Sequence, residues 1–281
     1  MEAELDSRFC SVDTNKHNHF DLWITLASLG LNMKINLPLK KTNHFQEMMQ
    51  LASGNKGDIT NGIRLSDKGV TFNFKMVKPQ VTSEGSVVGI DIGLKSVYST
   101  SNGQQSQCDV HGWDLDKIQD KLARRKKGSN GFRRAQTHRK NHINSVLNKM
   151  DWAGIKKIRI EKIKQMRYKS RTSRKLSHWT YTLIFDKLGS LAEEHGVHVQ
   201  EDNPAFTSRR CSQCGWVKRA NRKGKRLCCG KCGYTADADM NAAVNISLDL
   251  PEVTKEDKRS YYNRDGFYWN VAGHEPIVRV A

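Results

Sequence analysis

The chain has 281 residues, with 47 Lys and Arg against 29 Asp and Glu, so its formal net charge is +18. A hydrophobic share of 37% excludes wholesale disorder, and the length allows one large domain or two modest ones with a real core. The charge favours a polyanionic partner, with an ordinary soluble basic surface as the alternative.

The sequence also argues against secretion and membrane insertion. Its acidic start, MEAELDSRF, lacks the basic-then-apolar order of a signal peptide. The longest apolar-rich stretch, residues 20–33, is interrupted by polar residues and is too short to span a bilayer. Five of the seven cysteines fall between Cys211 and Cys232, which is typical of metal ligation in a reducing compartment. We therefore expect an intracellular protein of the cytoplasm or nucleoid, without a membrane partner.

Residues 1–84 are predicted to form a small β-rich N-terminal domain. Two segments alternate apolar and polar side chains and are expected to be strands, namely 34–39 and 69–77. Residues 44–53 are expected to form a short helix, and the residues rich in Gly, Asn and Asp at 54–62 a turn region.

Residues 85–210 are predicted to alternate strands and helices. The apolar run 87–94 indicates a strand with Asp91 in its middle, and residues 97–100 are its expected hairpin partner. Further strands are expected at 155–160, ending at Glu161, and at 197–200. Apolar residues at helical spacing predict helices at 114–127, around 143–150, and from 179 to 191. Residues 234–281 hold a last helix that opens at Asp237 and stops by Pro251.

The cysteines at 211–233 form two CxxC pairs, each followed by Gly and separated from one another by 14 residues. A CxxC turn brings two thiolates onto one cation, and two such turns complete a tetrahedral four-sulfur zinc site. We predict a structural zinc ribbon, with disulfides or a redox pair as the alternatives. The predicted zinc ligands are Cys211, Cys214, Cys229 and Cys232.

Two neighbouring features of the ribbon remain open. Cys228 is expected to be a spare thiol, although it could replace Cys229 as a ligand. The loop 218–226 carries six basic residues, and it either follows a phosphate backbone or is a solvated tip.

Three acids lie at or near structured elements, namely Asp91, Glu161 and Asp239. A carboxylate in an apolar strand is costly unless it is paired or bound to a metal. Each acid alone would more often be a surface or helix-capping residue. Together on successive elements of an α/β unit, they could form a two-metal site, because hard carboxylate oxygens suit Mg²⁺.

These segments resemble a known family. GIDIGLKSVYSTSNG, IRIEKIKQM and TSRRCSQCG…CCGKCGYTADADMNAAVNI are similar, in this order, to the three split motifs of the RuvC-like nuclease domain, with a zinc ribbon before the last. This is the pattern of the TnpB family and the related type V CRISPR effectors. The resemblance covers about residues 85–250 and implies an α/β, RNase H-like (RuvC) core with an inserted zinc ribbon. Residues 34–80 resemble the strand-rich part of the family's wedge-type barrel.

The resemblance also implies an activity and its residues. It assigns the three catalytic, metal-binding acids to Asp91, Glu161 and Asp239, with Asp237 a less suitable neighbour. It implies Mg²⁺- or Mn²⁺-dependent DNA cleavage by metal-activated water, structural zinc, and a guide RNA copied from the protein's own locus. The gene would suit a mobile element or a virus. A guide-independent nuclease for branched or single-stranded DNA and a non-cleaving binding protein remain the alternatives.

Basic segments around 121–140 and 162–175 are expected to bind the nucleic-acid backbone, with solvated charged faces as the alternative. Trp216 and Tyr168 are the better candidates for stacking on bases. The expected nucleic-acid contacts are Arg124, Arg125, Lys126, Lys127, Arg133, Arg134, Arg167, Arg171, Arg174, Arg210 and Arg222.

Overall fold

The computed structural model describes residues 2–14, 20–28, 30–52, 57–77, 79–93, 96–162, 181–202, 205–251 and 266–269. The chain divides into two compact units, Met1–Lys78 and Pro79–Ala281. This boundary lies a few residues before the one expected after residue 84. None of the helices in the described ranges is both long and apolar enough to cross a membrane.

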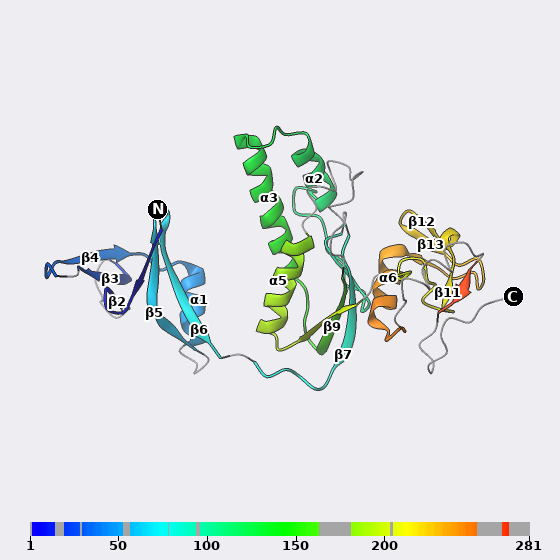
Figure 1. Cartoon of the computed structure of the whole chain (residues 1–281), viewed down its shortest axis with the longest axis horizontal. Helices are drawn as coiled ribbons and strands as arrows, with labels where there is room; N and C mark the ends of the chain where they lie inside the picture. Colours follow the sequence, from blue (N-terminus) through cyan, green and yellow to red (C-terminus); the bar gives the residue numbers. More distant parts are fainter. Residues whose placement is uncertain are drawn as a thin grey trace. The chain divides into compact units, whose positions relative to one another are not determined.

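The first unit contains two three-stranded antiparallel sheets (Figure 1). Their strand orders are β1 (Glu2–Asp6), β5 (Gly57–Ser66), β6 (Gly69–Met76), and β2 (Cys10–Asp13), β3 (Leu22–Ala27), β4 (Lys34–Leu39). Cys10, Ile24 and Ile63 form the buried core of the unit. Helix α1 (Asn43–Leu51) packs through Phe45, whose ring centroid lies 5.0 Å from that of Phe72. The two predicted strands and the short helix are thus confirmed.

The prediction of a turn region at 54–62 is wrong for most of that segment, because strand β5 begins at Gly57. This strand pairs with β1 on one side and β6 on the other, with an irregularity between Ile59 and Ile63. Backbone hydrogen bonds to two neighbours outweigh the low strand propensity of Gly, Asn and Asp. A Cβ at Gly62 would lie 3.2 Å from the Leu5 carbonyl oxygen, so the small residue serves a close backbone approach.

A four-stranded sheet forms the centre of the second unit. Its order is β10 (His198–Asp202), β9 (Ile155–Glu161), β7 (Ser86–Asp91), β8 (Ser99–Thr100). The first three strands run parallel, and β8 pairs antiparallel with β7. Parallel strands place their carboxyl ends at one edge of the sheet, so the residues at the ends of β7 and β9 gather there.

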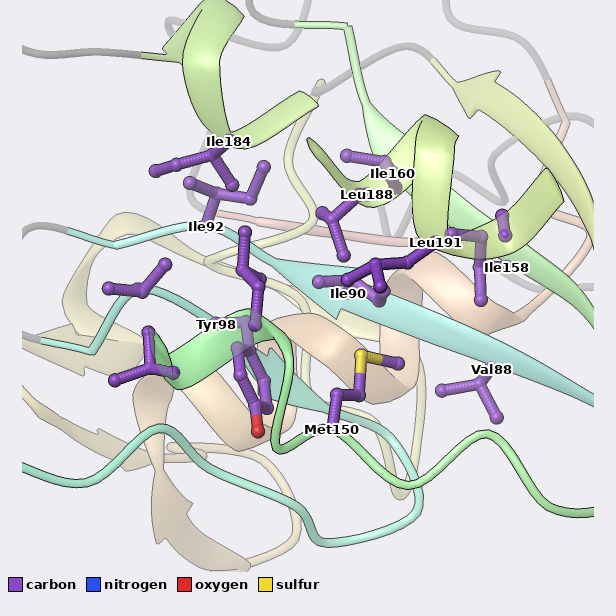
Figure 2. Packing of buried hydrophobic residues seen from close by; sticks show 14 of the residues in the cluster. Val88, Ile90, Ile92, Tyr98, Met150, Ile158, Ile160, Ile184, Leu188 and Leu191 are labelled. Carbon is purple, nitrogen blue, oxygen red and sulfur yellow. The ribbon is translucent and has the colours of Figure 1, made fainter. Parts of the chain in front are cut away.

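Helices cover both faces of this sheet (Figure 1). Helices α3 (Asn130–Leu147) and α5 (Tyr181–Glu194) lie on one face, α2 (Leu115–Ala123) packs on α3, and α6 (Ala238–Ser247) lies on the opposite face. Figure 2 shows Ile90 and Ile160 of the sheet with Leu188 of α5 in the fully buried core. The predicted mixed α/β core is therefore present.

The helix expected over 114–127 starts as predicted, because the Asp114 side chain accepts a hydrogen bond from the Lys117 N–H. It ends at Ala123, before the run of four basic residues. The chain then turns at Gly128, whose φ is +84°, and Ser129 caps α3. A side chain would be strained at that φ, so the glycine separates the two helices.

The cysteine segment forms a small ribbon that leads directly into α6. Strands β12 (Arg222–Lys223), β13 (Arg226–Cys228) and β14 (Thr235–Asp237) form one antiparallel sheet, preceded by the short 3₁₀ helix η3 (Arg219–Asn221). Strand β11 (Trp216–Val217) pairs with β15 (Phe267–Tyr268). Because β14 is followed at once by Ala238, the position of the ribbon is tied to the start of α6.

Candidate active site and metal centre

Two of the three acids lie side by side at the carboxyl edge of the sheet. Asp91 is the last residue of β7 and not its middle, because the strand ends there. Glu161 is the last residue of β9, and the register pairs Ile90 with Ile160. The two carboxylates therefore follow neighbouring positions on adjacent parallel strands. The Tyr181 hydroxyl holds the end of β9 by donating to the Glu161 carbonyl oxygen at 2.7 Å.

Asp239 reaches the same place from the first turn of α6, where it is only 3% exposed. The Asp237 side chain caps the helix, accepting from the N–H groups of Asp239 at 2.9 Å and Met240 at 3.0 Å. This explains how the two neighbouring acids differ, since Asp237 is occupied by the helix terminus. A Cβ at Gly93, two residues after Asp91, would lie 3.7 Å from Asp239 Oδ2. The loop after β7 and the start of α6 are thus in contact.

The environment of these acids disfavours their charged forms. Burial raises the pKa of Asp91 to about 7, with a further contribution from the charge of Glu161. Burial also raises the pKa of Glu161, while a hydrogen bond from Thr207 opposes this shift. Carboxylates brought together with little water repel one another, so the site favours the binding of cations.

Two cations of the ribbon already lie at this site. The Arg222 guanidinium is 3.1 Å from Asp239 Oδ1, and the Lys225 ammonium contacts Asp239 Oδ2. The charge of Arg222 also opposes the rise in pKa that burial causes at Asp91 and Glu161. Arg222 thus faces the acids, where the sequence predicted a contact to nucleic acid. Lys225, which sequence reasoning did not single out, lies in the predicted basic loop.

The four predicted zinc ligands form one cluster. Their sulfur atoms all lie within 4.8 Å of one another, with 3.7 Å between Cys211 and Cys232 and 3.6 Å between Cys214 and Cys229. A tetrahedral zinc with bonds of about 2.3 Å separates its sulfurs by about 3.8 Å. Cys228 is exposed and lies outside the cluster. Among the groups of three or more His, Cys, Asp or Glu residues within the described ranges, these four cysteines are the group whose ligand atoms lie close enough together to share one metal ion.

Arg210 does not have the exposed position that a phosphate contact requires. It is 4% exposed and donates to the carbonyl oxygens of Trp269 at 2.6 Å and Cys211 at 3.3 Å, and to Asn245 Oδ1 at 2.7 Å. The expected phosphate contact is therefore wrong. The position of Arg210 beside the first CxxC pair suggested a phosphate contact. In the structure Arg210 instead connects the ribbon to α6 by hydrogen bonds.

The other predicted nucleic-acid contacts include one buried side chain, several residues outside the described ranges and a group of exposed basic residues. Trp216 is 8% exposed and packs edge-on against Tyr268, so it is a core residue and not a stacking platform. Tyr168 lies outside the described residues, as do Arg167, Arg171 and Arg174. The remaining predicted contacts are exposed around the α2–α3 turn, namely Arg124, Arg125, Lys126, Lys127, Arg133 and Arg134.

Thr207 is a functional candidate that sequence reasoning missed. Its hydroxyl donates to Glu161 Oε1, although 46 residues separate the two in sequence. The residue stands at the start of the TSRRC segment, but a lone threonine there gives no sign of its partner.

Comparisons with known proteins identify relatives of this chain. Residues 181–246 match the family described as "Cas12f1-like, TNB domain". The chain is 34% identical over 151 residues to the CRISPR-associated endodeoxyribonuclease Cas12f1 of Sulfoacidibacillus thermotolerans, covering 52% of this chain and 33% of that protein. It is 27% identical over 203 residues to the putative RNA-guided DNA endonuclease InsQ of Escherichia coli, covering 60% of this chain and 50% of that protein.

Among solved structures, a Cas12f1–sgRNA–target DNA complex aligns with a TM-score of 0.49 and 16% identity, over 88% of this chain and 59% of that one. TnpB-like protein L79 of Acanthamoeba polyphaga mimivirus is 27% identical over 68% of this chain and 45% of its own length. The chain thus spans between a third and a half of the length of these curated relatives. The resemblance read from the sequence motifs is confirmed: the chain is related to the compact TnpB-like and Cas12f1 proteins.

Proposed function

We propose that this chain is a divalent-metal-dependent DNA endonuclease of the TnpB-like type, guided by RNA, with an RNase H-like (RuvC) core. The observation that carries the proposal is that β7 and β9 end side by side at Asp91 and Glu161, while the first turn of α6 brings Asp239 against the loop after β7. These elements are far apart in sequence, and their meeting at the carboxyl edge of a parallel sheet is typical of a ligand site in α/β proteins.

The donor set fits Mg²⁺ or Mn²⁺, because all three groups are hard carboxylate oxygens. When bound, such a metal pair activates water and stabilises the attacking and departing oxygens of a phosphodiester. Asp91, Glu161 and Asp239 would hold the ions. The raised pKa of Asp91 means that this carboxyl must release a proton near neutral pH before it can serve as a ligand.

The cysteine cluster fits structural zinc. Four sulfurs with tetrahedral spacing leave no position for substrate, so this ion would hold the ribbon together. Burial raises the pKa of Cys214 to about 12, so a bound cation is needed to keep this sulfur as a thiolate at neutral pH.

The exposed basic residues around the α2–α3 turn are the proposed contact to nucleic acid. Arg124, Lys126 and Lys127 stand in one turn, and Arg133 and Arg134 follow on the first turns of α3. Such a group attracts phosphates without reading sequence, and its binding weakens steeply as salt rises. It is suited to a guide RNA, a DNA strand or both.

The test starts from the purified full chain and any RNA that copurifies with it. That RNA is sequenced, and plasmid DNA matching it is incubated with the complex and Mg²⁺. We expect cleavage that needs a matching sequence and is lost in Asp91→Ala with binding retained. The control is Asp186→Ala, which removes an exposed acid of α5 and should leave cleavage unchanged.

Two results would count against the proposal. Cleavage of branched DNA by RNA-free protein would favour the guide-independent nuclease. Cleavage retained by the Asp91 variant would exclude the proposed acid site.

A further inference from the structure

The segment between β10 and the cysteine cluster contacts the proposed metal centre through one side chain. Thr207 is 5% exposed, and its hydroxyl donates to Glu161 Oε1. A hydrogen bond to one oxygen fixes the rotation of the carboxyl group and leaves the second oxygen for an ion. Such outer partners orient metal ligands in many metalloenzymes.

Thr207 is itself held by α6, the helix that carries Asp239. The Asn245 side chain donates to the carbonyl oxygens of Thr207 and of Arg210, each at 2.8 Å. One turn earlier, the Asn241 side chain donates to the Arg210 carbonyl oxygen at 2.7 Å. Two asparagines of one helix therefore fix the backbone that presents the hydroxyl.

These contacts connect an acid of the sheet with the helix that carries another acid. Glu161 ends a central strand, whereas Asp239 lies on a helix that packs against the sheet. The path from Glu161 through Thr207 to Asn245 joins the end of β9 to α6 by hydrogen bonds. The side chains in this path are all at least partly buried, so competition from water is weak.

We infer that Thr207 is a positioning residue for the metal centre. Its hydroxyl holds the Glu161 carboxylate in the orientation that binds the ion, and Asn245 ties Thr207 to α6. This inference rests on the proposed function, because it needs Glu161 to be a metal ligand. Thr207 acts through Glu161 and touches neither substrate nor ion.

The experiment measures Mn²⁺ binding by the zinc-loaded full chain, using electron paramagnetic resonance of the free ion. Thr207→Val keeps the shape of the side chain and removes its hydroxyl, and we expect Mn²⁺ affinity to fall about 10- to 100-fold. Thr207→Ser restores the hydroxyl and should restore most of the affinity. The matched control is Thr100→Val, which removes another buried hydroxyl, one that bonds to Asn102 and Gln104 in the turn after β8.

A double-mutant cycle with Glu161→Gln separates positioning from general damage. If Thr207 acts through Glu161, Thr207→Val should have little further effect on Mn²⁺ affinity in the Glu161→Gln background. An equal loss in both backgrounds, or an unchanged affinity of Thr207→Val, would overturn the inference. Mn²⁺ binding unaffected by Asp91→Ala and by Glu161→Gln would instead refute the proposed acid site.

Discussion

The approach of β7 to α6 gives the sharpest test of the site, because the backbones of the two elements touch at Gly89. A Cβ at this position would lie 2.1 Å from the Ala243 carbonyl oxygen and 2.4 Å from the Ser247 nitrogen. Real Cβ contacts essentially never fall below 3.0 Å, so the two backbones would have to separate by about 0.9 Å, the difference between 3.0 and 2.1 Å. Asp91 ends β7 two residues later, and Asp239 lies one turn before Ala243.

Gly89→Ala should therefore damage both stability and activity. Overpacking of a close-packed interior costs about 1–3 kcal/mol, and we expect the upper end because both clashing groups are backbone. A displacement of about 1 Å between catalytic groups can reduce the rate about 100-fold. The expected result is a free energy of unfolding lowered by about 3 kcal/mol and a cleavage rate lowered by about two orders of magnitude.

The assay combines urea unfolding, followed by tryptophan fluorescence, with plasmid cleavage at saturating Mg²⁺. Gly189→Ala is the matched control, because a Cβ there meets nothing within 4 Å and the residue lies inside α5. That change should stabilise the protein by about 0.5–1 kcal/mol and leave cleavage unchanged. If Gly89→Ala unfolds and cleaves like the unaltered protein, β7 and α6 do not touch at Gly89, and this contact does not hold Asp91 near Asp239.

Three further outcomes are expected. Removal of zinc by a chelator, or Cys229→Ser, should abolish the ordered ribbon and with it DNA cleavage. Circular dichroism and zinc content measure the loss of the ribbon, and full cleavage by zinc-free protein would contradict this prediction. Arg210→Met should lower the free energy of unfolding by about 1–3 kcal/mol for each buried acceptor that it leaves without a donor, among them the Trp269 carbonyl oxygen and Asn245 Oδ1. Salt-dependent DNA binding should stay unchanged. The pKa of Asp91, raised to about 7, means that the folded metal-free protein retains a proton that the unfolded chain releases near 3.8. Its stability should therefore fall as pH rises from about 4 to about 7, and Asp91→Asn should abolish this part of the change in melting temperature between pH 5 and 8.

Residue patterns with a local physical cause were predictable from the sequence. The strand ending at Asp91 carries the apolar run 87–90, and the strand ending at Glu161 has three isoleucines interleaved with basic residues. The two CxxC pairs predicted the zinc site, because the geometry of tetrahedral zinc dictates the short spacing within each pair. Helix α2 was predicted from the helical spacing of Leu115, Ile118 and Leu122, and the structure adds the Asp114 cap at its start.

Features that depend on distant partners were not predictable. Strand β5 is rich in poor strand formers and exists because both of its edges are paired. Arg210 and Trp216 resemble nucleic-acid contacts in sequence, yet both are buried by residues far along the chain. The hydrogen bond from Thr207 to Glu161 joins segments whose proximity is set by the parallel pairing of β9 and β10.

The ribbon has a second role beyond its own fold, which follows from the electrostatics of the acids. Asp239 is a nearly buried carboxylate, and its pairing with Arg222 and Lys225 offsets part of the cost of removing its charge from water. Both cations belong to the hairpin that the cysteines hold, and the Ala238 N–H donates to the Lys225 carbonyl oxygen at 2.8 Å. The hairpin and the start of α6 are therefore one hydrogen-bonded unit. A metal in the cysteine cluster would then fix the positive charge beside Asp239 as well as the ribbon, because only ten residues of chain run from Cys229 to Ala238.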